Sequence, residues 1–235
     1  MKTNKISKII LSAAMIITAP FFLTGCDIGG DITIPSGATD LSVNIKADDN
    51  ATDNPMDVIV ITEAKALITD IQYERERDGL NQLHQTGPFV ISLSLDGSLK
   101  ELFTGYVVRD IYTKAKFQMH KAEDNQTVSD PEFNEGHADN QRFSFIVKGT
   151  YNGVPFVYKS KRSMDLIINM NKATNINLKT GNLTMVFNKT TWFISNGTVL
   201  NPNLPQNADM IDNNIKDSFK KAFQDDNKDG QPDSN

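Results

Sequence analysis

The sequence predicts an all-β fold, an antiparallel β-sandwich followed by one C-terminal α-helix. Three observations support this prediction. Apolar residues alternate with polar ones through most of residues 41–200, which is the period of half-buried strands. Residues 152–153 are an Asn-Gly pair between two strand-like runs, and helical spacing of apolar residues occurs only near the C-terminus. About nine short strands in one unbroken series favour an antiparallel sandwich over alternating β/α units.

The expected strands follow one another at short intervals. The pattern at residues 63–67 is also compatible with a helix, and Trp192 and Phe193 are expected to end in the core. The strand-like runs are residues 41–46, 58–61, 66–71, 89–95, 99–106, 111–120, 142–161, 166–170, 176–178 and 183–187.

Two local signals are specific enough to predict geometry. Asn and Gly tolerate positive φ at both central turn positions, so Asn152 and Gly153 predict a tight type I′ hairpin. Tyr112 opens a strand after the turn at residues 105–109. A tyrosine at such a corner can donate its hydroxyl to upstream backbone, which is a stabilising role and not a functional one.

The long polar and acidic stretch at residues 123–141 predicts a mobile loop. Further on, the helical spacing of apolar residues predicts an amphipathic helix that lies on the sandwich or covers its edge. Asp209 and Asp212 in its first turns, and lysines later, suit the helix dipole. The apolar residues of this pattern are Ile211, Ile215, Phe219, Ala222 and Phe223.

The N-terminus carries an export signal. Three lysines precede an apolar stretch at residues 9–23, which has the length of a signal peptide and is too short to span a membrane. The Leu-Thr-Gly-Cys run at residues 23–26 then resembles the lipobox of bacterial lipoproteins. The resemblance implies lipidation of Cys26, cleavage before it, and a place in the cell envelope, anchored to a bacterial membrane on its periplasmic or surface side. An ordinary signal peptide with a chance cysteine is the alternative.

These features divide the chain into five expected parts. Gly, Asp, Pro and Ser enrich the segment after Cys26, so we expect a flexible tether there. The parts are a lipoprotein signal peptide at 1–25, a lipid-anchored tether at 26–40, a β-sandwich domain at 41–200, a linker with the amphipathic helix at 201–224, and an acidic tail at 225–235.

Composition excludes several classes of function. Residues 1–25 hold three lysines and no acidic residue, so the rest of the chain has 21 basic and 29 acidic side chains and a net charge near −8. Such a surface disfavours nucleic acid, whose binding depends on cationic contacts to phosphate. Cys26 is the only cysteine, so its lipidation would leave no thiol for a disulfide, a zinc site or a nucleophile.

A second resemblance covers about a third of the chain. The strand-like runs at residues 64–68, 89–93 and 110–117 are similar, in this order, to a group of exported bacterial β-sandwich lipoproteins of unassigned function. Arg109 and Asp110 stand where that group has Ala-Gly. The resemblance implies an immunoglobulin- or transthyretin-like fold, and its motifs describe packing, so it transfers no functional residue.

The best candidate for a functional site is the C-terminal tail. From Asp225 it reads Asp-x-Asn-x-Asp-Gly-x-x-Asp, which is similar to EF-hand, dockerin and thrombospondin type-3 calcium loops. Oxygens at positions 1, 3, 5, 7 and 9 would surround a hard cation, and glycine at position 6 allows the sharp turn. The expected calcium ligands are Asp225, Asn227, Asp229, Gln231 and Asp233.

The tail also departs from the calcium pattern. Position 12 would fall one residue past Asn235, so the bidentate glutamate and the exiting helix are missing. Affinity on the order of 10⁻⁴–10⁻³ M is expected for such a loop. A disordered acidic tail that keeps the terminus soluble is the alternative.

No catalytic motif emerges, so we expect no enzyme. His84, His120 and His137 are scattered, and His120 is interpreted as a surface residue. Four aromatic residues of the 142–161 hairpin fit the core better than a sugar-stacking platform. They are Phe143, Phe145, Phe156 and Tyr158.

The sequence is compatible with three functions. The first is a non-catalytic, lipid-anchored envelope lipoprotein with a binding, adhesion or structural role, which calcium would stabilise at its C-terminus. The second is a carbohydrate- or peptide-binding lipoprotein of a nutrient-uptake complex, and the third is a hydrolase with groove carboxylates. The expected partners are a membrane, through lipidated Cys26, and an unidentified envelope protein or glycan.

Overall fold

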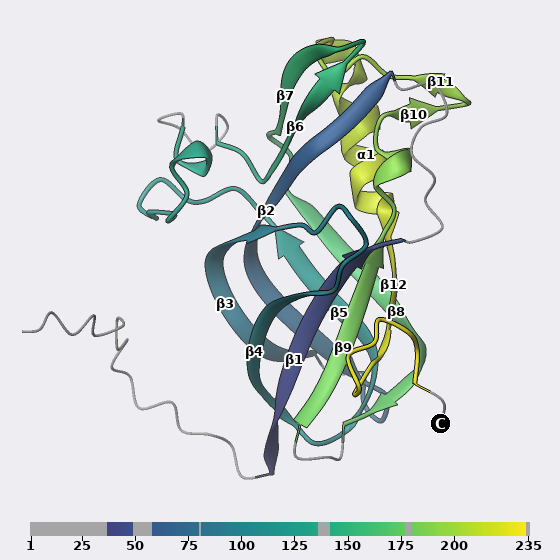
Figure 1. Cartoon of the computed structure of the whole chain (residues 1–235). Helices are drawn as coiled ribbons and strands as arrows, with labels where there is room; N and C mark the ends of the chain where they lie inside the picture. The colour runs from purple at the N-terminus through teal and green to yellow at the C-terminus, as the bar shows by residue number, and fades with distance from the viewer. Residues whose placement is uncertain (1–36, 49–57, 80, 136–141, 177–179, 234–235) are drawn as a thin grey trace, which may run out of the picture. The chain divides into compact units, whose positions relative to one another are not determined.

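A single curled β-sheet and one C-terminal helix make up the fold (Figure 1). The computed structural model describes residues 37–48, 58–79, 81–135, 142–176 and 180–233. The strands of the sheet are β1 Ala38–Ala47, β2 Ile59–Arg75, β3 Asn81–Ser92, β4 Lys100–Val108, β5 Ile111–Met119, β6 Phe145–Tyr151, β7 Val154–Ser160, β8 Met164–Asn175, β9 Thr180–Phe187 and β12 Phe219–Gln224.

Smaller elements lie between these strands. β10 and β11 form a separate two-stranded ribbon. Short 3₁₀ turns precede β6, follow β9 and lead into the helix. The remaining elements are β10 Ile194–Ser195, β11 Thr198–Val199, η1 Pro131–Phe133, η3 Lys189–Thr191, η4 Pro205–Asn207 and α1 Ala208–Ser218.

The mostly β fold with a single C-terminal helix is confirmed, but the expected antiparallel sandwich, of immunoglobulin or transthyretin type, is not, because the sheet is mixed. Its order is β4-β1-β9-β12-β8-β5-β2-β6-β7, with β3 paired to β2. β1 and β9 run parallel over eight residue pairs, and β12 is parallel to β8 at Ala222 and Met170. Alternation of apolar and polar residues predicts strands with two unlike faces, but it carries no information on the direction of the neighbouring strand.

The sheet curls into a half-barrel that brings the end strand β4 beside β3 (Figure 1). The 17-residue strand β2 allows this, because its first half pairs with β6 and its second half with both β5 and β3. Phe89 of β3 then meets Phe103 of β4, with ring centroids 6.2 Å apart. Lys100 Nζ of β4 donates to the carbonyl oxygen of Ser92 at 2.8 Å. Side chains therefore close the gap between these two strands.

The inner face of the sheet holds the hydrophobic core. Trp192 is fully buried at its centre, stacked on Phe187 at 5.6 Å and edge-on to Phe145 at 5.5 Å. Its Nε1 donates to Ser218 Oγ at 2.8 Å, which satisfies the one polar atom of the ring. Phe193 is also buried. The expectation that Trp192 and Phe193 end in the core is confirmed.

Both specific local predictions are confirmed. Asn152 and Gly153 have φ values of 50° and 76° between β6 and β7, as a type I′ turn requires. Tyr112 donates its hydroxyl to the carbonyl oxygen of Val108 at 2.6 Å. Its ring is buried edge-on against Tyr73. The tyrosine thus fastens the turn between β4 and β5.

The predicted C-terminal helix is correct only in its first part. α1 buries Ile211 and Ile215 as expected, but it ends at Ser218. Phe219, Ala222 and Phe223 lie instead on β12, which enters the sheet between β9 and β8. This strand has a register shift near Phe219 and buried residues on both faces. Its apolar residues therefore do not alternate strictly, and their spacing resembles that of a helix.

The segment at residues 121–135 is packed, contrary to the mobile loop expected from sequence. It lies beside the β6–β7 hairpin and carries η1 (Figure 1). Val128 and the fully buried Phe133 join Leu67 and Ile146 in a second small apolar cluster on the outer face of the sheet. Burial of these apolar side chains contributes to holding the polar segment against the sheet. Residues 136–141 lie outside the described part of the chain.

Candidate metal site at the C-terminus

The C-terminal loop, residues 225–233, starts directly after β12, so a strand and not a helix enters it. Its first residue, Asp225, is fully buried. Asp225 Oδ1 accepts from the backbone N–H of Asp229 at 2.9 Å, and Oδ2 accepts from that of Gly230 at 3.0 Å. Oδ2 also accepts from Thr184 Oγ1 at 2.6 Å. One carboxylate therefore folds the loop around itself and joins it to β9.

Two further predicted ligands continue the same turn. Asn227 Oδ1 accepts from the N–H of Asp229 at 3.2 Å, and Asp229 Oδ1 accepts from that of Gln231 at 2.8 Å. Asn227 Nδ2 donates to Asp229 Oδ2 at 2.9 Å. Gly230 has a φ of 77°, a conformation that favours glycine. The turn predicted from the Asp-x-Asn-x-Asp-Gly spacing is therefore present.

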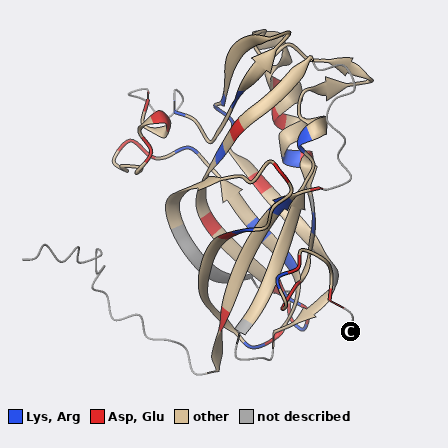
Figure 2. Cartoon of the chain, in the orientation of Figure 1, with Lys and Arg blue, Asp and Glu red and all other residues tan. Residues whose placement is uncertain are grey.

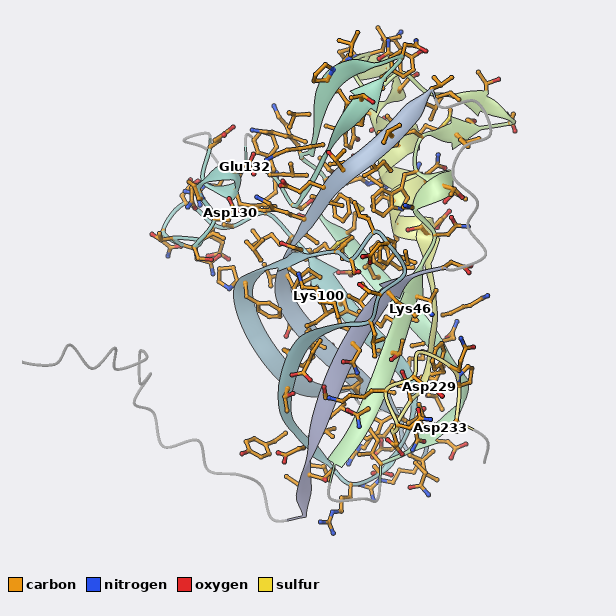
Figure 3. All side chains as sticks on the ribbon, viewed as in Figure 1. Lys46, Lys100, Asp130, Glu132, Asp229 and Asp233 are labelled. Atoms are coloured by element: carbon orange, nitrogen blue, oxygen red, sulfur yellow. The ribbon has the colours of Figure 1, made fainter. Side chains whose placement is uncertain are left out.

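Asp233 closes the loop at its base. Its Oδ2 accepts from the N–H of Asp226 at 2.7 Å, and its own N–H donates to the carbonyl oxygen of Gln224 at 3.0 Å. Figure 3 shows Asp229 and Asp233 on this loop. Residues 225–233 are thus an ordered turn and not the free acidic tail that was the alternative. Residues 234–235 lie outside the described chain.

A calcium ion fits this loop in part. Carboxylate and amide oxygens are the hard donors that calcium prefers, and Asp225, Asn227 and Asp229 lie in one turn. Within the described ranges, however, no group of three or more His, Cys, Asp or Glu side chains is placed to hold a metal ion. Asn227 and the Gln231 carbonyl would have to complete a shell that begins with Asp225 and Asp229.

The loop rests on polar side chains of β1, β4 and β9. Asn182 of β9 donates its N–H to Asp226 Oδ1 at 3.0 Å. Lys46 of β1 is 7% exposed, and its Nζ lies 3.5 Å from the carbonyl oxygen of Gly230. Lys228 pairs with Glu101 of β4 at 3.0 Å. Hydrogen bonds from Lys228, Ser42 and Thr104 lower the pKa of Glu101, so this carboxylate is charged at neutral pH.

The contacts between the loop and these strands were not predicted from the sequence. Lys46, Asn182 and Thr184 alternate with core residues along their strands, a pattern that is typical of a face turned to solvent. The loop at residues 225–233 contacts all three on that face. No motif in β1 or β9 signals these contacts.

A second charged cluster lies under the 121–135 segment. Lys65 Nζ of β2 contacts Asp130 Oδ2 and Glu132 Oε2 at 2.7 Å each, and Lys148 Nζ of β6 contacts Glu132 Oε2 at 2.9 Å. Glu63 lies within 3.2 Å of both lysines. Figure 2 shows the acidic residues of this segment in red, and Figure 3 labels Asp130 and Glu132.

The pKa shifts in this cluster describe a stable ion network. Hydrogen bonds from Lys148 and Lys65 lower the pKa of Glu132 to about 2. Burial opposes the charge of Lys65, but hydrogen bonds to Asp130, Glu132 and Glu63 outweigh it and raise the Lys65 pKa. Every carboxylate here faces an ammonium group. The cluster therefore fastens the segment to β2 and β6.

Two open hollows flank the junction of α1 and β12. The first has a volume of about 430 Å³ and is lined by Asn188, Asp217 and Lys221 among others. The second, of about 410 Å³, lies between α1 and β8 and includes Asp165 and Asp217. Both are wide open to solvent and lack a buried charged group in their walls. They do not form a site of defined chemistry.

Two further pairs of titratable side chains lie elsewhere in the structure. His120 Nε2 lies 3.1 Å from Asp165 Oδ1 on the outer face of β5 and β8. Tyr158 donates its hydroxyl to the buried Asp212 of α1 at 2.6 Å. Burial raises the pKa of Asp212, and it also raises the pKa of Tyr158. The second pair joins β7 to the helix.

The hairpin aromatics belong to the core, as expected. Phe145, Phe156 and Tyr158 are buried, and the rings of Phe156 and Tyr158 both pack edge-on against Phe193. Phe143 is partly buried beneath Lys159, whose Nζ lies 5.1 Å from the ring centroid. These four residues do not form an exposed stacking platform. Cys26 lies outside the described residues.

Comparison with protein-family models, with curated proteins and with solved structures finds no match for this chain. Across the described ranges, α1 and the other helical turns are too short or too polar to traverse a bilayer.

Proposed function

We propose that this protein is a non-catalytic, lipid-anchored lipoprotein of the bacterial cell envelope whose C-terminal loop binds calcium. Its β domain serves in binding, adhesion or envelope structure, with an envelope protein or a glycan as partner. The structural observation that supports the calcium part is the turn in which Asp225, Asn227 and Asp229 are already joined by hydrogen bonds.

The envelope location is supported by the sequence motif at residues 23–26 behind an apolar stretch of signal-peptide length. Two or three acyl chains on Cys26 would hold the protein at the membrane, because each buried methylene contributes about 0.8 kcal/mol. The acidic domain would then stand in the aqueous phase on a Gly- and Asp-rich tether.

The alternative of a carbohydrate-binding lipoprotein receives less support. Such a protein would be favoured by a row of exposed aromatic side chains on one sheet face. On β6 and β7 the aromatic side chains of Phe145, Phe156 and Tyr158 point into the core. The rings of these three residues are therefore not available to stack on a glycan.

Palmitate labelling tests the anchor. A bacterial host that expresses the full chain is grown with radiolabelled palmitate, and the wild type is compared with Cys26→Ser. Label in the wild type only, with a mature chain that begins at Cys26, is the expected result. An unlabelled wild type that retains Met1 in the cytosol would contradict the proposal.

Calorimetric titration with calcium tests the loop. We expect the wild type to bind with a dissociation constant on the order of 10⁻⁴–10⁻³ M. Asn227→Ala and Asp229→Asn, which alter exposed side chains of the loop, should each abolish the heat. Asp217→Asn is the matched control, because this exposed carboxylate lies on α1 outside the loop. Equal heats from all four proteins would refute the calcium site.

A further inference from the structure

The two surfaces that meet under the C-terminal loop are both polar. The loop contains no apolar side chain apart from Pro232, which is exposed. Beneath it, the outer faces of β1 and β9 present polar side chains that are almost completely buried. These are Ser42 at 2%, Asn44 at 1%, Lys46 at 7%, Asn182 at 6% and Thr184 at 0% exposed.

Hydrogen bonds and one ion pair hold these surfaces together. Thr184 Oγ1 donates to Asp225 Oδ2 at 2.6 Å. The N–H of Asp225 donates to the carbonyl oxygen of Asn182 at 3.0 Å, and Lys228 pairs with Glu101 at 3.0 Å. The loop therefore fastens three strands, β9, β4 and β1, from outside the sheet.

The polar character of this contact determines the free energy needed to open it. Burial of apolar surface contributes roughly 25 cal/mol per Å² to the stability of a core. A hydrogen bond that water can replace contributes only about 1 kcal/mol net. Lifting the loop would expose groups that water can satisfy and would leave the apolar contacts of β9 and β12 intact. Segments of this kind open locally at a lower free energy than the core.

We propose that residues 225–233 form a releasable clasp that opens as a unit from β1, β4 and β9 while the sheet stays folded. Thr184 is the positioning residue of this clasp, because its hydroxyl fixes the Asp225 carboxylate when the loop closes. The closed clasp fastens β1, the first strand of the described part of the chain.

The role of calcium in this clasp rests on the proposed function. Asp225 would be both the first oxygen ligand of the ion and the acceptor of the Thr184 hydroxyl. An ion that binds the closed loop better than the open one shifts the equilibrium toward closing. Calcium binding and closing of the loop are therefore coupled, and each should strengthen the other.

Amide hydrogen exchange on the full chain, without calcium, tests the clasp. The N–H groups of Asp229 and Gly230 report on the loop, and that of Ala222, in the strand between β9 and β8, reports on the sheet. We expect the two loop amides to exchange together, at least about 100-fold faster than Ala222, as local opening requires. Equal rates at all three amides would overturn the proposal.

Variants of the positioning residue sharpen the test. Thr184→Val removes the hydroxyl at similar volume, so the loop amides should exchange about tenfold faster, as loss of one hydrogen bond predicts. Ala222 should be unaffected, and Thr184→Ser should restore the wild-type rates. Acceleration of all amides by the same factor would show a merely structural role. Glu101→Gln, at an exposed partner of Lys228, provides a second way to loosen the loop without touching the core.

The same measurement with millimolar calcium chloride separates the two proposals. Slower exchange at Asp229 and Gly230, in parallel with calorimetric heat, supports the coupling. Heat without slower loop exchange overturns the coupling. Absence of both refutes the calcium site of the proposed function, and the comparison of wild type with Thr184→Val then still decides whether the clasp exists.

Discussion

The hydroxyl of Thr184 donates a 2.6 Å hydrogen bond to the carboxylate of Asp225, which lies 41 residues further along the chain. Asp225 is fully buried and accepts three hydrogen bonds, from Thr184 Oγ1 and from the N–H groups of Asp229 and Gly230. A buried carboxylate is tolerated only when such donors replace its water. The contact explains how a loop whose one apolar side chain, Pro232, is exposed stays in place on the sheet.

Replacement of Asp225 by alanine should destabilise the protein by about 3 kcal/mol, because it leaves three donors without their acceptor. Urea unfolding followed by circular dichroism measures the loss. Asp217→Ala, which removes an exposed carboxylate of α1, should change the free energy of unfolding by less than about 0.5 kcal/mol. If both variants unfold at the same urea concentration, Asp225 does not hold the loop.

Alanine substitutions at Gly230 and, as the matched control, at Gly197 test the contact between the loop and Lys46. Both have positive φ, 77° and 75°, so alanine costs about 1–2 kcal/mol at either position. A Cβ at Gly230 would also lie 3.2 Å from Cδ and Nζ of Lys46, whereas one at Gly197 meets no atom within 4 Å.

Gly230→Ala should therefore destabilise the protein by about 1 kcal/mol more than Gly197→Ala, as crowding at a packed site predicts. Thermal unfolding of the two variants measures the difference. Identical losses would mean that Lys46 is displaced without cost and does not support the loop.

Tyr112→Phe tests the corner between β4 and β5. The variant removes the 2.6 Å hydrogen bond to the Val108 carbonyl oxygen but keeps the buried ring, so about 1–1.5 kcal/mol of stability should be lost. Tyr106→Phe is the control, since this ring is 45% exposed. A loss of the same size in both variants would assign no special role to the corner.

Glu132 should contribute to stability in a pH-dependent manner. Its ion pairs with Lys148 and Lys65 lower its pKa from 4.5 to about 2 in the folded protein. The contribution is therefore complete above pH 4.5 and is lost as the pH falls through about 2. The difference in unfolding free energy between the wild type and Glu132→Gln should shrink over this range.

The exposed Glu76 is the reference for this pH profile. Glu76→Gln removes an exposed carboxylate on the turn that follows β2 and is measured over the same pH range. Parallel profiles for Glu132→Gln and Glu76→Gln would show that the network does not fasten the 121–135 segment.

Local features of this fold were predictable from sequence where a few neighbouring residues suffice. Asn152 and Gly153 specify their turn by backbone sterics alone, and α1 begins where its amphipathic pattern begins. Trp192 is too large and apolar to stay outside the core. The strand β12 was not predictable, because Phe219 and Phe223 satisfy a helical period equally well and only the open slot between β8 and β9 selects the extended form.

The candidate site also has one part that was predictable from sequence and one part that was not. The Asp-x-Asn-x-Asp-Gly spacing predicts the turn, since its hydrogen bonds join residues at most five positions apart. That spacing does not predict the contacts of the loop with the distant residues Lys46, Asn182 and Thr184. Asp233, the fifth expected ligand, accepts a hydrogen bond from the N–H of Asp226 at the base of the loop, and this contact was not predicted.

By itself, the sequence determined that this chain forms strands, where two of its turns lie, and how the C-terminal loop bends. Each of these depends on interactions between residues close together along the chain. The tertiary structure alone decided that β1 runs parallel to β9, that β12 fills the centre of the sheet, and that Asp225 is buried against Thr184. These depend on which distant segments meet, and strand alternation is compatible with many such pairings.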